Sequence, residues 1–370
     1  MKILFACRKF DKVFGGVERM AIALMNEMVR RGHAVSLLTW DETDNARAFY
    51  EMAPHIVWHK IALGGPDQKA GWPLRFRRAV KVRRLVKRIT PDVMIGFQHG
   101  TFLALRLFTL GLDIPTVAAE RNAPDRFEFL SEGKRRHIIL PSFLLADRVT
   151  IQCESYREGY PAYLRPRIVT IPNPVFPAKR QAAPAGKGQA GKILLSVGRL
   201  SYQKHYDVMI DAFARLAKEF PDWQMVIAGD GEDRGKLEKS IAQYGLASRI
   251  KLSGATGDVE SAYCQAHLFC LPSRWEGFPN ALAEALSHGL PAVGFAGCAG
   301  VRDLIRDGET GFLAPGNGDV ATLTEALRRA MRDDDLRGRM GQAARESTQD
   351  YAPEKIFGRW EKVFRDLAGP

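Results

Sequence analysis

The stretch SRWEGFPNALAEALSHGLPAVGF, residues 273 to 295, holds a Gly-Phe-Pro-Asn turn followed by a helical pattern. Proline is favoured in the first turn of a helix, where its missing N–H group costs nothing. Apolar residues follow Pro279 at helical spacing, namely Ala281, Leu282, Ala285 and Leu286. The sequence therefore predicts a helix that begins near Pro279.

We expect the first turn of this helix to bind a phosphate. Its N–H groups, from about Asn280 onward, lack partners within the helix, and the helix dipole adds to their attraction for an anion. Glu276 stands in the preceding turn and Glu284 lies inside the helix, so two carboxylates flank one phosphate site. One could bind the hydroxyls of a sugar and the other those of a ribose. The alternative is a surface helix with two solvated glutamates.

A second element precedes it in the chain. ILLSVGRL, residues 193 to 200, predicts a buried parallel strand, because its apolar residues run with little alternation toward Gly198. Arg199 and Lys204 follow this strand, and open α/β sheets bind ligands at the carboxyl ends of their strands. Two cations there suit a diphosphate, with Arg acting through its planar fork and Lys as a point charge. The alternative is a pair of solvated loop cations.

These two elements together resemble the donor-binding half of family 4 glycosyltransferases, which are retaining enzymes of the GT-B fold. Similar segments occur in the right order over most of the chain: FGGVERMAIALMNEMVRRGHAVSLLT at 14 to 39, IPNPV at 171 to 175 and DLIRDGETGFLAPGNGDVATLTEAL at 303 to 327. The resemblance implies an α/β protein with two Rossmann-like, doubly wound domains that face a central cleft. It also implies transfer of a sugar from a nucleotide sugar, with UDP as the expected nucleotide.

The resemblance assigns roles to residues of the second half. Glu276 would orient the donor sugar, Glu284 would hold the ribose, and Arg199 and Lys204 would stabilise charge on the leaving diphosphate. The turn residues would contact the nucleotide sugar, namely Phe278, Pro279, Asn280 and Ala281. No enzyme base is obvious, so we expect the leaving diphosphate to take the acceptor proton. The chain departs from the family where His205 and Asp303 replace the usual Gly and Glu, and the first change predicts different backbone geometry near the diphosphate.

The first half holds weaker candidates. Gly15 and Gly16 open a helix after the first strand, where glycine permits close approach of a phosphate or sugar; a simple turn is the alternative. His99 follows a buried strand, and the resemblance implies contact with the sugar or the acceptor, whereas a lone histidine is often structural. Glu120 and Arg121 follow another short strand as acceptor candidates, or form a buried ion pair. The sequence ERN at 120 to 122, with Pro124 after it, also resembles a subgroup that transfers N-acetylhexosamines in bacterial surface-glycan assembly.

Length and patterning predict two domains. The chain has 370 residues, of which 46 % are hydrophobic and 26 % charged, a globular composition too long for one ordinary core. Strand-like runs alternate with helical patterns, as βαβ folds require. We expect an N-terminal acceptor domain at 1–178 and a donor domain at 179–350, with the segment 178–192 as linker. By resemblance, the final helix, 351–370, packs back on the first domain.

Positive charge is concentrated in the first half. Residues 1 to 178 carry 28 Lys and Arg against 17 Asp and Glu, whereas the remainder carries 26 against 25. The segment 73–89, PLRFRRAVKVRRLVKRI, interleaves eight basic residues with an apolar stripe. Such a helix suits an anionic membrane surface or a phosphorylated acceptor, with its apolar stripe packed on the protein. The alternatives are a solvated helix face and, less favoured, nucleic acid; we expect no nucleic-acid partner.

The sequence fits a disulfide-bonded, metal-dependent, secreted or membrane-spanning protein poorly. The five cysteines show no paired spacing, and no Asp-x-Asp follows a strand, so we expect neither disulfides nor a metal, and no cofactor besides the donor substrate. The opening MKILFAC predicts a strand rather than a signal peptide, and no segment is apolar enough to span a membrane. We therefore expect a cytoplasmic enzyme, peripheral on the inner face of the membrane.

The predicted function is transfer of a hexose or N-acetylhexosamine to a lipid-linked glycan, lipopolysaccharide or exopolysaccharide acceptor. A soluble disaccharide synthase and a non-catalytic binding protein remain as alternatives. A dinucleotide oxidoreductase would need G-x-G-x-x-G followed by an acidic residue, and neither GGVERM nor GDGEDRG provides it.

Overall fold

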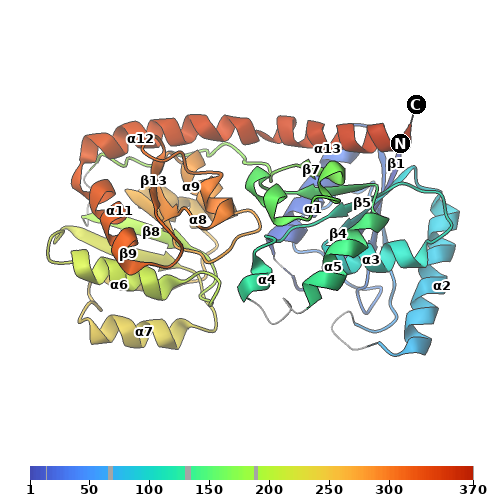
Figure 1. Cartoon of the computed structure of the whole chain (residues 1–370), viewed down its shortest axis with the longest axis horizontal. Coiled ribbons are helices and arrows are strands. Elements are labelled where there is room, and N and C mark those ends of the chain that lie inside the picture. The colour runs from blue at the N-terminus through green and yellow to red at the C-terminus, as the bar shows by residue number, and fades with distance from the viewer. Residues whose placement is uncertain (14, 66–69, 130–134, 187–190, 370) are drawn as a thin grey trace. The chain divides into compact units, whose positions relative to one another are not determined.

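The computed structural model describes residues 1–13, 15–65, 70–129, 135–186 and 191–369. They form two compact units, one of Met1–Pro174 with Glu354–Pro370 and the other of Val175–Pro353. Each unit is built on a parallel β-sheet covered by helices (Figure 1). Two doubly wound α/β domains were predicted from the sequence, and this fold class is confirmed.

The first unit contains a seven-stranded sheet in the order β3-β2-β1-β4-β5-β6-β7. Its strands are β1 (Lys2–Cys7), β2 (Ala34–Thr39), β3 (Val57–Lys60), β4 (Val93–Phe97), β5 (Thr116–Ala119), β6 (Arg148–Ile151) and β7 (Ile168–Thr170). Its main helices are α1 (Gly16–Arg30), α2 (Trp72–Ile89), α3 (His99–Phe108), α4 (Arg126–Phe129), α5 (Arg136–Ser142) and α13 (Pro353–Ala368). The chain order reverses between β1 and β4, which makes their carboxyl ends the switch point where such sheets bind ligands.

The second unit contains a six-stranded sheet in the order β10-β9-β8-β11-β12-β13. Its strands are β8 (Lys192–Val197), β9 (Trp223–Ala228), β10 (Ile250–Gly254), β11 (Leu268–Leu271), β12 (Ala292–Phe295) and β13 (Gly311–Ala314). Its helices are α6 (Tyr206–Leu216), α7 (Arg234–Gln243), α8 (Val259–Gln265), α9 (Asn280–Ser287), α10 (Ala299–Arg302), α11 (Val320–Arg332) and α12 (Asp334–Ser347). The switch point of this sheet lies between β8 and β11.

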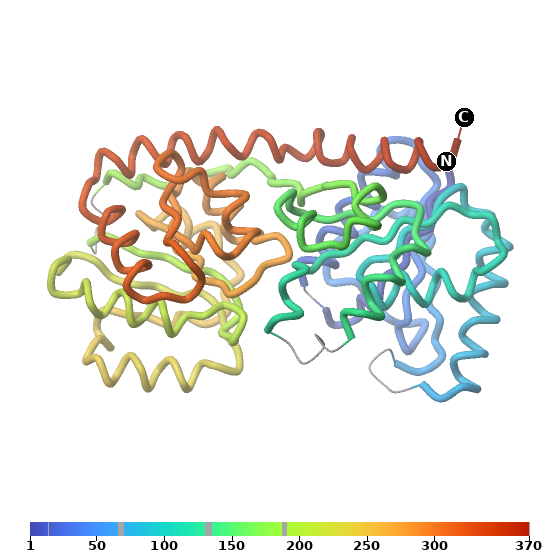
Figure 2. The backbone as a smooth tube through the Cα atoms, in the orientation of Figure 1, coloured from blue at the N-terminus to red at the C-terminus, as the bar shows by residue number. Residues whose placement is uncertain are grey.

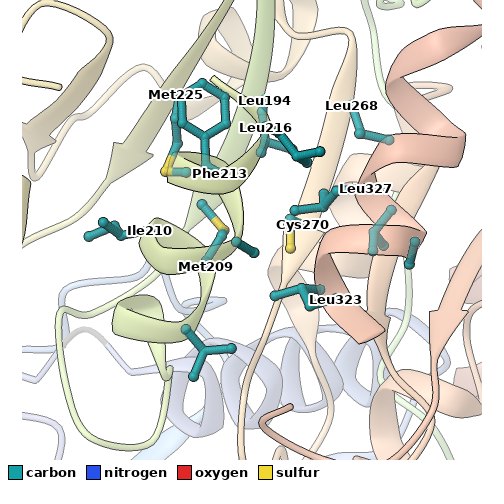
Figure 3. Packing of buried hydrophobic residues seen from close by; sticks show 14 of the residues in the cluster. Leu194, Met209, Ile210, Phe213, Leu216, Met225, Leu268, Cys270, Leu323 and Leu327 are labelled. Carbon is teal, nitrogen blue, oxygen red and sulfur yellow. The ribbon is translucent and has the colours of Figure 1, made fainter. Parts of the chain in front are cut away.

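The core of the second unit fixes the strand ends that carry its site. Met209 and Phe213 of α6 and Leu327 of α11 pack over the middle of the sheet, where Cys270 of β11 is fully buried (Figure 3). Leu194 and Leu268 pair across the β8–β11 contact. Because interiors are close-packed, β8 and β11 are held in a fixed register and their following loops start from fixed points.

The predicted linker, 178–192, is not where the chain passes between units. That passage falls at Pro174 and Val175, and the chain returns at Glu354. Within the predicted linker, the Ala182 N–H donates to the carbonyl of His288, and the fully buried Arg337 donates to the carbonyl of Pro184. These bonds attach the described part of the segment to the second unit, whereas its composition had indicated a free connection; residues 187–190 lie outside the described residues.

Helix α13 belongs to the first unit, as the resemblance had implied. Its apolar face, including Phe357, Trp360 and Phe364, is buried beside strand β1 and helix α1, and Figure 2 shows the two ends of the chain close together in this unit. At the end of α1, Arg31 and His33 contact Glu361 at 2.7 and 3.0 Å. The apolar face supplies the burial, and Glu361 fixes the register of the helix.

The contacts of Glu361 predict an acid-sensitive attachment of α13. Hydrogen bonds from Arg31, and less strongly from Arg365 and His33, outweigh burial and lower the pKa of Glu361 to about 2. Its stabilisation is therefore present above the ordinary pKa and is lost as the pH falls toward 2. Glu361→Gln should lower the free energy of unfolding near pH 7 by about 1–3 kcal/mol, measured by urea titration. The difference from wild type should disappear between pH 4.5 and about 2.

The matched control is Glu354→Gln. This carboxylate also contacts Arg31 but is 75 % exposed, so its loss should change stability by less than about 0.5 kcal/mol. Equal effects of the two substitutions would contradict the role assigned to Glu361.

Candidate active site

Two loops meet at the carboxyl ends of the adjacent strands β8 and β11. The N–H of Arg274 donates to the carbonyl of Gln203 at 2.9 Å, and the Gln203 side chain donates to the carbonyl of Trp275 at 2.8 Å. The Arg274 guanidinium also lies 4.1 Å from the centre of the Tyr202 ring. These contacts fasten the loop that contains Lys204 to the loop that contains Glu276.

Lys204 and Glu276 form an ion pair in this junction. The Lys204 Nζ lies 2.6 Å from Oε1 of Glu276, which also accepts a hydrogen bond from Ser273 at 2.6 Å. Burial alone would lower the pKa of Lys204, but the carboxylate of Glu276 outweighs it and the pKa stands above its usual value. The lysine is therefore a fixed, fully charged group, with Glu276 only 5 % exposed beneath it.

The start of α9 differs slightly from the prediction. Pro279 is the N-cap residue, and its carbonyl accepts the N–H of Ala283. The N–H of Asn280 already donates to the carbonyl of Phe278 at 2.9 Å, because the turn closes on itself before the helix begins. The predicted anion site therefore starts at Ala281 rather than at Asn280.

Phe278 and Glu284 hold this turn and helix in place. The Phe278 ring is 6 % exposed and packs against Tyr351 with ring centres 6.0 Å apart, so it anchors the turn inside the unit. Glu284 lies within α9, where the Tyr263 hydroxyl is 3.1 Å from one of its carboxylate oxygens and 3.1 Å from the carbonyl of Ala281. Tyr263 thus orients the carboxylate predicted to hold a ribose.

Arg199 and Gly198 complete the loop after β8. Arg199 is exposed and makes no ion pair with any residue that the structure describes. A Cβ on Gly198 would lie 2.9 Å from both Cε of Lys204 and the Tyr206 hydroxyl. Glycine is therefore required here because the lysine side chain runs directly past the backbone.

His205 retains the backbone geometry that a glycine would give. It adopts the left-handed conformation, with φ 56° and ψ 38°, which costs a non-glycine residue roughly 1–2 kcal/mol. Its ring packs against Gly318, where a Cβ would lie 2.7 Å from Cε1 of His205, and burial lowers its pKa to about 4. The left-handed conformation is one that glycine adopts without strain, so His205 keeps a backbone conformation open to the glycine that is usual in the family.

The glycines at the start of α1 do not present an open phosphate site. A Cβ on Gly15 would lie 2.3 Å from an oxygen of Glu18, and the backbone groups of Gly15 and Glu18 hydrogen-bond to that carboxylate. Burial nevertheless raises the pKa of Glu18. The carboxylate of Glu18 therefore lies at the start of α1 beside Gly15, where a bound phosphate was predicted.

Glu120 and Arg121 are buried and form part of the interior of the first unit. A carboxylate oxygen of Glu120 accepts the N–H groups of Arg121 and Asn122 at 3.0 and 2.9 Å. Arg121 donates to Asn173, and burial lowers its pKa to about 10. Neither residue lines the neighbouring pocket, whereas the next residue, Asn122, does.

His99 lies at the first residue of α3 and lines that pocket. Its Nε2 is 2.7 Å from the Ser142 hydroxyl, which donates its own proton to the carbonyl of Ile139. Nε2 therefore carries the proton and Nδ1 is the acceptor. Burial lowers the pKa of His99, with Glu120 opposing and Arg126 adding to the effect, so the ring is neutral at neutral pH.

Sequence reasoning missed several residues that line the same pocket, of about 710 Å³. Arg8 directly follows β1, a position that could have marked it as a ligand-side residue. Arg126 and Arg135 come from the segment after β5 and carried no such signal. Among the described residues no group of three or more His, Cys, Asp or Glu is arranged to hold a metal ion, and none of the described helices is long and apolar enough to cross a membrane.

Comparisons with known families agree with this arrangement. Glycosyl transferases group 1 match residues 178–347, and Glycosyltransferase Family 4 matches residues 14–179. The two matches cover both units of the chain almost completely.

Individual proteins are similar over nearly the whole chain. An uncharacterized glycosyltransferase of Haemophilus influenzae is 26 % identical, with 94 % of this chain and 96 % of that protein covered. A Campylobacter jejuni α-1,4-N-acetyl-D-galactosaminyltransferase that acts on a diphosphate-undecaprenol glycan is 24 % identical, with 99 % of each covered. The crystal structure of Anabaena HepE in complex with UDP and glucose superposes with a TM-score of 0.76 at 18 % identity, over 98 % of this chain and 99 % of that one. The chain belongs to glycosyltransferase family 4 and is a glycosyltransferase of the GT-B fold.

Proposed function

We propose that this enzyme transfers a hexose or N-acetylhexosamine, with retention of configuration, from a UDP-sugar to a lipid-linked or polysaccharide acceptor. The observation that carries the proposal is the charged Lys204, held 2.6 Å from the buried Glu276 beside the start of α9. It combines a cation for the diphosphate, a carboxylate for the sugar hydroxyls and a helix terminus for phosphate oxygens. The UDP present with HepE supports the choice of nucleotide.

Four groups of the second unit would each bind a different part of the nucleotide sugar. The amide of Ala281 and the α9 dipole would face the diphosphate. The exposed Arg199 would bind the diphosphate through its guanidinium group. Glu284, oriented by Tyr263, would accept hydrogen bonds from the ribose hydroxyls. Glu276 would accept those of the sugar once Lys204 shifts toward the diphosphate, because an incoming double negative charge competes with the carboxylate for the ammonium group.

The proposed chemistry breaks the bond between C1 of the sugar and the diphosphate oxygen. The acceptor hydroxyl attacks C1 on the face from which the diphosphate leaves, and its proton passes to the departing oxygen. Lys204 and Arg199 stabilise the charge that develops on this oxygen, so the proposal requires no metal or other cofactor. The neutral His99, with Nδ1 as an acceptor, would contact the sugar or the acceptor hydroxyl.

Helix α2 supports a membrane-associated acceptor. Val82, Leu85 and Val86 are buried against the sheet, so the apolar stripe packs on the protein as predicted. Six of the eight basic side chains are exposed, namely Arg75, Arg77, Lys81, Arg84, Lys87 and Arg88. The other two are Arg78, which is buried and donates to the carbonyls of residues 63 to 65, and Arg83, which is half-buried and donates to the carbonyl of Leu110.

The outer side of α2 is suited to anionic lipid. It borders a pocket of about 810 Å³ that is lined by apolar residues and by Lys60, Arg77, Lys81, Arg84 and Arg88, with Asp44 as the acidic residue among the described lining. Trp72 and Phe76, at the start of the helix, are 82 % and 71 % exposed. We propose that this face binds the cytoplasmic leaflet of the membrane peripherally. A soluble disaccharide synthase, the second candidate, would not need a membrane-binding face.

Donor binding is the first test of the proposed function. A UDP-sugar in EDTA should raise the melting temperature of the wild type, because a ligand that binds only the folded state stabilises it. Glu284→Ala should abolish most of this shift, whereas Glu238→Ala, on the exposed surface of α7, should keep it. No shift with UDP-, GDP- or ADP-sugars would refute the donor site.

The kinetics of two alanine variants should distinguish the role of Lys204 from that of Glu284. Lys204→Ala should lower kcat by roughly 10²–10³-fold, since it removes charge stabilisation from the transition state, while Glu284→Ala should act mainly on the donor KM. Steady-state kinetics measure both, and Lys204→Arg should recover part of kcat. Equal changes of kcat and KM in the two alanine variants would contradict this division.

Membrane binding is tested without an acceptor. Arg84→Glu combined with Arg88→Glu should weaken co-sedimentation with phosphatidylglycerol vesicles at least roughly 10-fold, given about 1 kcal/mol for each basic residue near an anionic surface. Lys239→Glu combined with Lys251→Glu makes the same change of net charge in the second unit and should leave binding intact. Neither pair should alter donor binding, and equal binding to phosphatidylcholine vesicles would argue against an anionic surface as the partner.

A further inference from the structure

Tyr206 carries a buried hydroxyl group that makes no hydrogen bond to any residue that the structure describes. The residue is the first of α6 and is 2 % exposed. Ser196, on β8, is fully buried, and its hydroxyl likewise has no hydrogen bond within the described ranges of the chain. A buried hydroxyl without a hydrogen bond costs free energy in the folded state, so this pair needs a physical explanation.

The Tyr206 hydroxyl lies next to the ammonium group of Lys204. A Cβ on Gly198 would be 2.9 Å from the hydroxyl oxygen of Tyr206, 2.9 Å from Cε of Lys204 and 3.4 Å from its Nζ. Both side chains therefore end at the same side of one glycine. Burial raises the pKa of Tyr206 to about 12, although the nearby Lys204 and Ser196 oppose this effect. The phenol is thus neutral near pH 7, and it can accept one hydrogen bond while it donates another.

Lys204 at present uses a different acceptor. Its Nζ lies 2.6 Å from Oε1 of Glu276, and it makes no hydrogen bond to Tyr206. An ammonium group has three N–H donors, so one carboxylate oxygen does not exhaust them. Cys298 also lies close enough to raise the pKa of Lys204, but a thiol is a weak hydrogen-bond acceptor. The phenol oxygen is therefore the better second acceptor.

The proposed function requires Lys204 to move away from Glu276. The double negative charge of the donor's diphosphate competes with the carboxylate for the ammonium group, and the N–H groups that do not face the phosphate oxygens then need another acceptor. The Tyr206 oxygen can accept one of them, and the Tyr206 proton can pass to the oxygen of Ser196 as a hydrogen bond. In this arrangement both buried hydroxyls gain the partner that they otherwise lack.

We infer that Tyr206 is a positioning residue for Lys204, and that its hydroxyl accepts a hydrogen bond from the ammonium group when a diphosphate draws the lysine away from Glu276. The inference rests on the proposed function and deepens it, because it names the residue that holds Lys204 in its donor-bound position. Hydrogen bonds that are absent from the free enzyme form in the complex, so they add to the affinity for a nucleoside diphosphate.

The test is calorimetric titration of the full chain with UDP and, separately, with UMP. The two nucleotides share the uracil, the ribose and one phosphate, so the ratio of their dissociation constants reports the contribution of the outer phosphate. Tyr206→Phe should weaken UDP binding roughly 10-fold, the loss usual for a hydrogen bond to a charged group, and should weaken UMP binding much less. The matched control is Tyr244→Phe, whose hydroxyl bonds to Asp211 on the surface of the same unit, and it should leave both affinities unchanged.

A double-mutant cycle shows whether Tyr206 acts through Lys204. Lys204→Met removes the ammonium group and keeps a side chain of similar length, so Tyr206→Phe should have no further effect on UDP binding in that background. Equal losses with and without the lysine would overturn the inference, because Tyr206 would then act by another route.

The melting temperature of the free enzyme provides a readout that a merely structural tyrosine would fail. Tyr206→Phe should leave it unchanged or raise it, because the hydroxyl that is removed makes no hydrogen bond there. A clear fall would mean that this hydroxyl is already bonded in the free enzyme, which contradicts the inference.

Failure of the inference is distinguishable from failure of the proposed function. If the wild type binds UDP and Tyr206→Phe binds it equally well, the inference is wrong and the donor site stands. If the wild type binds none of UDP, GDP and ADP, the proposed function is wrong, and the inference falls with it.

Discussion

The structure of the donor half depends on the parallel pairing of β8 and β11. Since these neighbouring strands end at the same edge of one sheet, the loops that follow them share a boundary, and Lys204 comes within 2.6 Å of Glu276 although 72 positions separate them in sequence. Burying two charged groups costs desolvation free energy. The hydrogen bond from Ser273 to Glu276 and the attraction between Lys204 and Glu276 offset this cost. The buried ion pair therefore lies at the carboxyl ends of two adjacent strands, the position at which such sheets bind ligands.

The surrounding loop shows how much backbone constraint this arrangement requires. Gly198 has no space for a side chain because the lysine passes it, and His205 accepts a left-handed conformation that its buried ring against Gly318 stabilises. Both features act on the segment between β8 and α6. They constrain the backbone on both sides of Lys204, so its side chain starts from a fixed point beside Glu276.

The first unit uses charge in two distinct ways. The exposed cations of α2 face outward around a broad, partly apolar pocket, whereas Arg78 turns inward with Arg8, Arg126 and Arg135 at the switch point. The carboxylate of Glu18 lies at the helix start beside Gly15. In this unit, then, exposed cations lie along α2, arginines line the pocket beside His99, and a carboxylate of the chain itself lies at Gly15.

The amino-acid sequence by itself determined the fold class, the doubly wound pattern, the family and the amphipathic helix at 73–89, because hydrophobic periodicity and turn residues act locally and are readable one segment at a time. It also singled out Lys204, Glu276, Glu284 and His99. Only the tertiary structure decided that Lys204 and Glu276 pair, that Glu120 and Arg121 are interior, that Arg78 is buried, and that the 178–192 segment packs on the second unit. The physical reason is that burial, ion pairing and competition for backbone N–H groups depend on which strand ends and loops the sheet brings together, and no local pattern records that.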